Sequence, residues 1–169
     1  MRRAVLGVFK SLIQARQAVE KIRRENLANN YISVVVRSKT FYSGAYKEEF
    51  AQELTLFPAE KILGIFDGYL VQSGPLEMPG LGEILAGGPF AGTLLQERDK
   101  GLSGNLANLG LSAEHASNFE HQVRDGSILV IVEADSEHAN AIVNHLHALG
   151  GREIEKWSRT NPKPTYPRK

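Results

Sequence analysis

The most apolar run of the chain covers residues 128–134, and five of the six side chains from Ile128 to Glu133 are branched aliphatics. Such continuity is typical of a β-strand buried on both faces, because a strand with one face in water alternates apolar and polar positions. A similar run covers residues 4–9, where Gly7 is expected to allow close approach of another backbone. We therefore predict two central strands of a sheet, one near each end of the chain.

Each of these runs is followed by an amphipathic helix. In the first helix, apolar side chains recur at helical spacing and form one stripe: Leu12, Ala15, Val19 and Ile22. Ser11 precedes this stripe and Gln14 stands three positions later, which is the spacing of an N-terminal capping box. The second helix follows Asp135–Ser136 and ends at Gly150–Gly151.

The two strand-helix segments match each other at an offset of 124 residues, and a further candidate strand follows each helix, at residues 31–37 and 152–157. Two β-α-β units in tandem predict an α+β fold of the ferredoxin-like type, an antiparallel sheet with helices on one face. In that arrangement the two apolar strands are central and the charged strand 152–157 is an edge. The uncovered face of the third strand then needs either the insertion or a second subunit against it.

We expect a single domain over residues 1–157 that carries a long mixed insertion at 38–126, followed by a basic, proline-rich tail at 158–169 that is extended or disordered. Several segments of the insertion have their own pattern: a possible helix over 47–56, a helix start at Pro58, an apolar stretch over 62–71, a Gly/Pro-rich stretch over 73–92, and a helix capped by Ser112 that ends at Asp125–Gly126.

Composition excludes several classes of function. The chain has no cysteine, so disulfides, zinc-thiolate sites and thiol nucleophiles are absent. Both ends of the chain are basic and the middle is acidic, but the net charge is only +1. Because nucleic-acid binding depends on a positive surface, we expect no nucleic-acid partner. No secretory signal pattern opens the chain and no stretch is apolar enough for an integral membrane segment, so we expect a cytoplasmic protein.

Three segments carry a family resemblance. Residues 78–91 read Met-Pro-Gly-Leu-Gly-Glu-Ile-Leu-Ala-Gly-Gly-Pro-Phe-Ala, residues 110–116 read Gly-Leu-Ser-Ala-Glu-His-Ala, and residues 119–130 read Phe-Glu-His-Gln-Val-Arg-Asp-Gly-Ser-Ile-Leu-Val. With the strand-helix-strand opening, this order resembles the bacterial general stress, or heat-induced stress, protein family of small domains, over about residues 3–157. The resemblance implies a stress-related role in a bacterium, and it brings no catalytic residues.

The Gly/Pro-rich segment is the first candidate for a binding or interface site. Its residues are Pro79, Gly80, Gly82, Gly87, Gly88 and Pro89. Backbone N–H groups at such glycines can approach a phosphate or another chain closely. The segment has no Gly-Lys-Ser/Thr ending and no strand-turn-helix context is expected there, so it is neither a P-loop nor a dinucleotide site. The alternative is an irregular crossover packed over the sheet.

The histidines and serines predict no catalytic residue, metal site or cofactor. Glu114, Asn118 and His121 fall on one face of the helix after Ser112, with His115 rotated away, and no three ligands stand at metal-binding spacing. His138 and His145 share a margin of the last helix, and His147 faces the other way. The serines at 11, 112 and 136 are explained as helix caps.

Our first hypothesis is therefore a non-enzymatic, stress-related module that acts through homodimerisation or protein interaction. One alternative is a small-ligand sensor that uses segment 79–91. A second alternative is an enzyme built on a dimeric α+β barrel, with a histidine in the cavity of the sheet. Of these hypotheses, we favour the module without catalytic activity over the enzyme.

Overall fold

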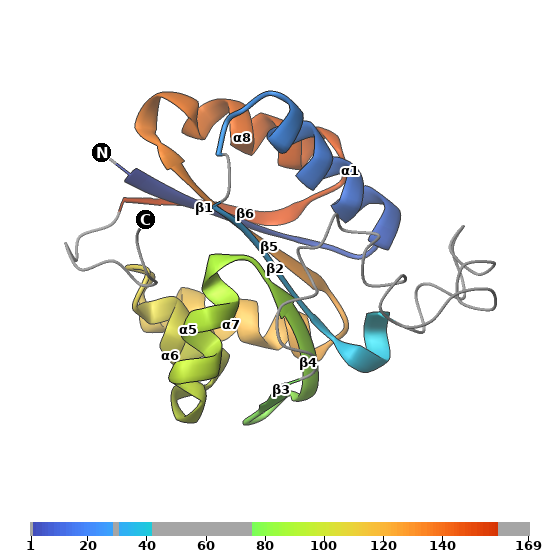
Figure 1. Ribbon diagram of the computed structural model, residues 1–169, viewed down its shortest axis with the longest axis vertical. Helices are drawn as coiled ribbons and strands as arrows, with labels where there is room; N and C mark the ends of the chain where they lie inside the picture. The colour runs from blue at the N-terminus through green and yellow to red at the C-terminus, as the bar shows by residue number, and fades with distance from the viewer. Residues whose placement is uncertain (1, 29–30, 42–75, 159–169) are drawn as a thin grey trace.

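The computed structural model describes residues 2–28, 31–41 and 76–158. These residues form an α+β fold around a six-stranded antiparallel sheet, in the order β3-β4-β2-β5-β1-β6 (Figure 1). The strands are β1 (Arg2–Phe9), β2 (Ile32–Arg37), β3 (Leu76–Met78), β4 (Gly82–Gly87), β5 (Ile128–Asp135) and β6 (Arg152–Ser158). As predicted, β1 and β5 are interior strands and, among the described strands, the charged strand β6 is an edge. Because β3 and β4 extend the sheet beyond β2, the middle of the six strands is β2-β5 and β1 lies next to the edge.

Helices cover both faces of this sheet. They are α1 (Leu12–Arg24), α5 (Pro89–Gln96), α6 (Gly101–Ala107), α7 (Ala113–Arg124) and α8 (Ser136–Ala148), with a short 3-10 turn, η2 (Arg98–Lys100), before α6. Figure 1 shows α1 and α8 on one face and α5, α6 and α7 on the other. The expectation of helices on one face only is therefore wrong, because the insertion supplies a second helical layer.

The two faces of the central strands pack into two separate cores. In β5, Val130 and Val132 pack with α1 and α8, whereas Leu129 and Ile131 pack with the helices of the insertion. All residues from Ile128 to Ala134 are buried, which confirms the strand buried on both faces. The cover on the second face comes from the insertion, one of the two possibilities that the sequence left open.

Two of the three predicted helix caps are present. The Ser11 hydroxyl accepts from the Gln14 N–H at 3.2 Å, and the Ser112 hydroxyl accepts from the His115 N–H at 3.2 Å. Each bond satisfies one of the free N–H groups at the start of a helix. Ser136 is not a cap, since α8 begins at this residue and Asp135 holds the cap position without a side-chain capping bond.

The Gly/Pro-rich segment is ordered secondary structure, and its interpretation as an irregular crossover is wrong. It forms the hairpin β3-β4, with Leu76 opposite Ile84 and Met78 opposite Gly82, and then turns at Gly88 into α5. The segment was misread because a three-residue strand next to glycines and a proline leaves little strand pattern in the sequence. A strand-turn-helix context, which the sequence did not predict, is present at Gly88.

Gly88 is required by close packing as well as by its backbone. Its φ is +89°, and a Cβ added there would lie 2.7 Å from the Cα of Ser33 and overlap the carbonyl oxygen of Ile32. The Phe90 N–H, at the start of α5, donates to the Ser33 hydroxyl at 3.0 Å. The turn therefore docks α5 directly onto β2.

Several predicted segments lie outside the described residues: the helices expected over 47–56 and from Pro58, the apolar stretch 62–71, and residues 159–169 of the tail. Ser158 belongs to β6, so the strand extends one residue into the expected tail. Within the described ranges, no helix has the length and apolar character needed to cross a bilayer.

We predict that Gly88→Ala lowers the free energy of unfolding by about 3 kcal/mol or more, because left-handed strain adds to a backbone overlap. Gly82→Ala is the matched control, since Gly82 also has a positive φ of +76° but nothing lies within 4 Å of an added Cβ. The Gly82→Ala variant carries the backbone strain without the overlap, and it is expected to lower the free energy of unfolding by about 1–2 kcal/mol. Urea unfolding of both variants measures the difference, and equal losses would contradict the packing argument.

Candidate functional site

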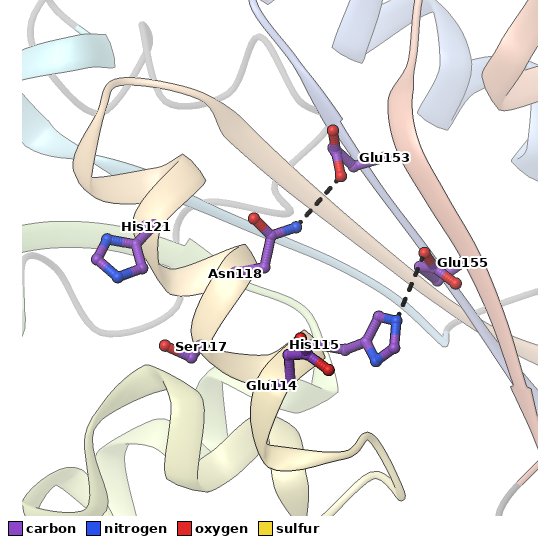
Figure 2. Close-up of a pocket in the computed structure, with 7 residues that line it drawn as sticks. All are labelled: Glu114, His115, Ser117, Asn118, His121, Glu153 and Glu155. Atoms are coloured by element: carbon purple, nitrogen blue, oxygen red, sulfur yellow. Dashed lines mark hydrogen bonds and ion pairs between the residues drawn. The ribbon is translucent and has the colours of Figure 1, made fainter.

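A polar cleft lies between α7 and β6, on the face of the sheet that the insertion covers (Figure 2). Its volume is about 480 Å³, and its lining residues are Glu114, His115, Ser117, Asn118, His121, Glu153 and Glu155. The first five come from α7 and the last two from β6, so the cleft joins parts of the chain more than 30 residues apart.

A β-bulge in β6 shapes one wall of the cleft. Leu6 of β1 is opposite Glu155, but Val8 is opposite Arg152, so β6 contains one extra residue over this interval. At the bulge Glu153 has a φ of +54°, a left-handed conformation that is unfavourable for a non-glycine residue. Gly7 lies opposite the bulge, where an added Cβ would come within 3.2 Å of the Ile154 side chain. The close neighbour is therefore a side chain and not the backbone that the sequence predicted, since the Arg152 carbonyl oxygen would lie at an ordinary 3.7 Å.

The bulge directs the Glu153 side chain toward α7. The Asn118 amide Nδ2 donates to Glu153 Oε1 at 3.2 Å, which links the two walls of the cleft (Figure 2). Bulges of this kind often re-aim a side chain at a functional site, and strained residues gather at such sites. The unusual backbone of Glu153 therefore points to a role for its carboxylate outside the core.

His115 sits between the start of α7 and β6. Its Nδ1 is 2.8 Å from the Ser112 hydroxyl, and its Nε2 is 4.0 Å from Glu155 Oε2. Its ring meets the Trp157 ring edge-on, with centroids 4.9 Å apart and the planes at 70°. When the hydroxyl donates to Nδ1, the ring proton is on Nε2 and faces the Glu155 carboxylate.

Arg124 organises the far end of α7. Its Nη1 is 2.9 Å from His121 Nδ1, its Nη2 donates to Glu120 at 3.1 Å, and its Nε donates to the Gly80 carbonyl at 3.0 Å. Because a guanidinium can only donate, His121 accepts at Nδ1. The arginine thereby ties the tip of the β3-β4 hairpin to the helix that lines the cleft.

The residues of the Gly/Pro-rich candidate segment are split between two places. Pro79, Gly80 and Gly82 are exposed at the tip of the hairpin. Gly87 and Gly88 are buried at the junction of β4 and α5, and Pro89 is half-buried at the first position of that helix. None of the six lines the cleft between α7 and β6.

The lining of the cleft is acidic. It contains three carboxylates and no lysine or arginine, so it is negatively charged when the two histidines are neutral. Lys156 lies on the same strand but belongs to the opposite face, where its Nζ donates to Asn140 of α8 at 2.8 Å. Among the described residues, no group of three or more potential ligands is arranged to hold a metal ion.

The histidines of α8 lie elsewhere. His145 Nε2 is 2.9 Å from Glu25 Oε1, at the end of α1, and Glu25 also pairs with Lys21 at 2.9 Å. The hydrogen bond from Lys21, followed by that from His145, lowers the pKa of the Glu25 carboxyl. This pair joins two helices on the other face of the sheet. It takes no part in the cleft.

Sequence reasoning found part of the α7 wall and missed the rest of the site. Glu114, Asn118 and His121 share a helix face as predicted, and all three line the cleft. His115, which was placed on another face, also lines it, because β6 runs close to the start of the helix. Glu153 and Glu155 were read only as charges of an edge strand. Their alternation was the one available signal that two carboxylates share a face.

Comparisons with protein-family models, with curated proteins and with solved structures found no match to this chain.

We predict that Glu153→Gly raises the free energy of unfolding by about 1 kcal/mol, because glycine adopts a positive φ without the strain that glutamate carries. Glu155→Gly is the matched control. Glu155 is paired regularly with Leu6, so glycine there is expected to destabilise by about 0.5–1 kcal/mol. Both values come from urea unfolding. A loss of stability in Glu153→Gly would show that the Asn118 contact outweighs the strain.

Proposed function

We propose that this chain is a non-enzymatic module that acts through protein interaction, in the stress-related role that the family resemblance implies, and that the cleft between α7 and β6 is its interaction site. The observation that carries the proposal is the gathering of three carboxylates from two distant segments, without a basic residue among the lining side chains. Charge of one sign around a concave surface attracts an oppositely charged partner and favours its association.

The exposure of these side chains favours recognition over chemistry. Glu114, Ser117, His121 and Glu153 are exposed, and the other three lining residues are half-buried. Catalytic groups act most strongly where water is excluded, whereas exposed side chains are available to contact a partner. The small-ligand alternative at segment 79–91 is less favoured, because Gly88 packs on β2 and the Ser33 hydroxyl already occupies the Phe90 N–H.

A ferredoxin-like core is part of this proposal. Four strands of the sheet run in the order β6-β1-β5-β2, and the two β-α-β units place α1 and α8 on the same face. That order, with the two apolar strands in the centre, supports the tandem arrangement expected from the internal repeat. The hairpin β3-β4 then extends the sheet beyond β2.

Homodimerisation and a bacterial, cytoplasmic setting also belong to the proposal. The uncovered sheet face that suggested a second subunit is covered here by α5, α6 and α7. A second copy would thus have to bind at a sheet edge or on the outer surface of the helices. Native mass spectrometry at micromolar concentration tests this part, and a monomer alone would remove it.

The cleft is tested with N-acetyl-lysine amide, a cation too short to form a strand. We predict that it shifts the NMR signals of the Trp157 indole N–H and the Asn118 side chain, and that the shifts vanish in the triple variant Glu114→Gln, Glu153→Gln, Glu155→Gln. The control triple variant changes Glu77, Glu83 and Glu137, which are exposed and outside the cleft, and is expected to keep the shifts. Equal loss in both variants, or no shift at all, would refute the site.

An enzyme is the second candidate, and one observation favours it. A hydroxyl, a base and an acid lie in a row, as in a nucleophile that a base activates: Ser112, His115 and Glu155. The Ser112 hydroxyl is 2.8 Å from His115 Nδ1, and His115 Nε2 is 4.0 Å from Glu155 Oε2. Hydrolysis of p-nitrophenyl acetate that is lost in both Ser112→Ala and His115→Ala would support this candidate. We expect no hydrolysis above that of a histidine-containing control protein, because the serine hydroxyl is held as the cap of α7.

A further inference from the structure

The edge strand β6 has a cleft on each of its two faces. Among the described residues it pairs only with β1, so its other edge is not bonded to a strand. Beside it, on the face of α8, lies a second cleft of about 480 Å³, lined by Val143, His147, Gly151, Arg152, Glu153 and Ile154. An unpaired strand edge with a pocket on either side is the geometry that receives an added strand.

The two clefts differ in chemistry because most side chains of β6 alternate between them, although Glu153, at the bulge, lines both. Glu153 and Glu155 face α7, in the acidic cleft. Ile154 packs against the core formed with α1 and α8, and together with Val143 it makes part of the second cleft apolar. A strand laid along β6 would place its own alternate side chains over these two surfaces.

We propose that β6 binds an extended peptide of a partner protein by strand addition, with basic side chains over the α7 cleft and apolar side chains over the α8 cleft. This inference rests on the proposed function and specifies the partner and its mode of binding. Backbone hydrogen bonds to the edge supply sequence-independent affinity. The basic and apolar positions supply selectivity.

A second copy of β6 is a poor occupant of this edge. Two copies of β6 related by a two-fold axis would pair antiparallel and continue the sheet. Residues opposite each other in such a pair lie on the same face of the sheet. The two-fold axis must therefore pass through one residue position, and that residue pairs with its own copy. Centring on Glu153 or Glu155 puts that glutamate opposite itself, and centring on Ile154 puts Glu153 opposite Glu155. Centring on Arg152 or Lys156 puts that basic residue opposite itself. Only registers centred on the last two residues, Trp157 and Ser158, avoid a like-charge pair within the strand, and they pair few residues of β6. Like charges directly opposite are destabilising, so the registers with the most β6 pairs are disfavoured, whereas a basic strand meets no such repulsion from the glutamates.

The probe is a fluorescent nine-residue peptide that alternates lysine with valine, titrated into the full chain and followed by anisotropy at low salt. We expect saturable binding that weakens as salt is added. Two control peptides have the same length: one with glutamate in place of lysine, and one with the lysines and valines kept but alternate backbone nitrogens methylated. Methylation removes the edge hydrogen bonds without changing the charge, and is expected to weaken binding by about tenfold or more.

The protein variants Glu153→Gln and Glu155→Gln are each expected to raise the Kd of the peptide by about 2- to 5-fold, which is the range for partly exposed ion pairs. Glu137→Gln is the matched control, because Glu137 carries the same charge on α8 and its side chain is 77% exposed. Hydrogen exchange provides the second readout, with new protection expected at the amides of β6. Protection confined to another segment would overturn the proposal.

The outcomes separate this inference from the proposed function. If the methylated peptide binds as well as the unmodified one while N-acetyl-lysine amide still shifts the cleft signals, strand addition is wrong and the cleft stands. If neither probe binds, both are wrong. Self-association that raises the apparent peptide Kd and disappears when the chain is truncated after Ser158 would assign the edge to residues 159–169 of a second copy. That result would overturn the partner-peptide proposal.

Discussion

The interior strands β1 and β5 are apolar on both faces, so the chain has to cover both faces of its sheet. Leu129 and Ile131 face one way and Val130 and Val132 the other, so each face must be covered or a large apolar surface is left in water. The helices of the repeat cover one face. The insertion folds back as α5, α6 and α7 to cover the other, and thereby brings α7 alongside β6.

Covering both faces leaves the edges of the sheet as the places where its backbone is accessible. At β3 the edge is three residues long, whereas β6 is longer and carries a bulge that interrupts its pairing with β1. The bulge holds Glu153 in a strained conformation and turns its carboxylate toward Asn118. A positive φ at a non-glycine residue is unfavourable, and such residues gather at functional sites, which is why this position enters our proposal.

The same glutamates are the basis of the proposed selectivity of this edge. Glu114 and Glu153 are exposed and Glu155 is half-buried, and on our proposal they favour a basic strand over most pairings between identical copies. The adjoining apolar cleft around Val143 and Ile154 adds a preference for apolar side chains at alternate positions. The proposed function would use an edge strand and the surfaces on each side of it.

The internal repeat was readable from the sequence because local periodicity and caps agree with the tertiary arrangement. Strands β1 and β5, helices α1, α7 and α8, and the caps Ser11 and Ser112 all follow from patterns within about 15 residues. The hairpin β3-β4 was missed because Leu76–Met78 is too short to show a period, and Gly88 reads as a loop residue until its contact with Ile32 is known. The candidate site required the tertiary structure, since His115 and Glu155 lie 40 residues apart in the chain. The apolar pattern identified most of the core, because apolar side chains are driven out of water, although the polar Asn105 and Glu133 are buried as well. Which charges share a cleft could not be read from the chain, because that depends on how α7 packs beside a bulged edge strand.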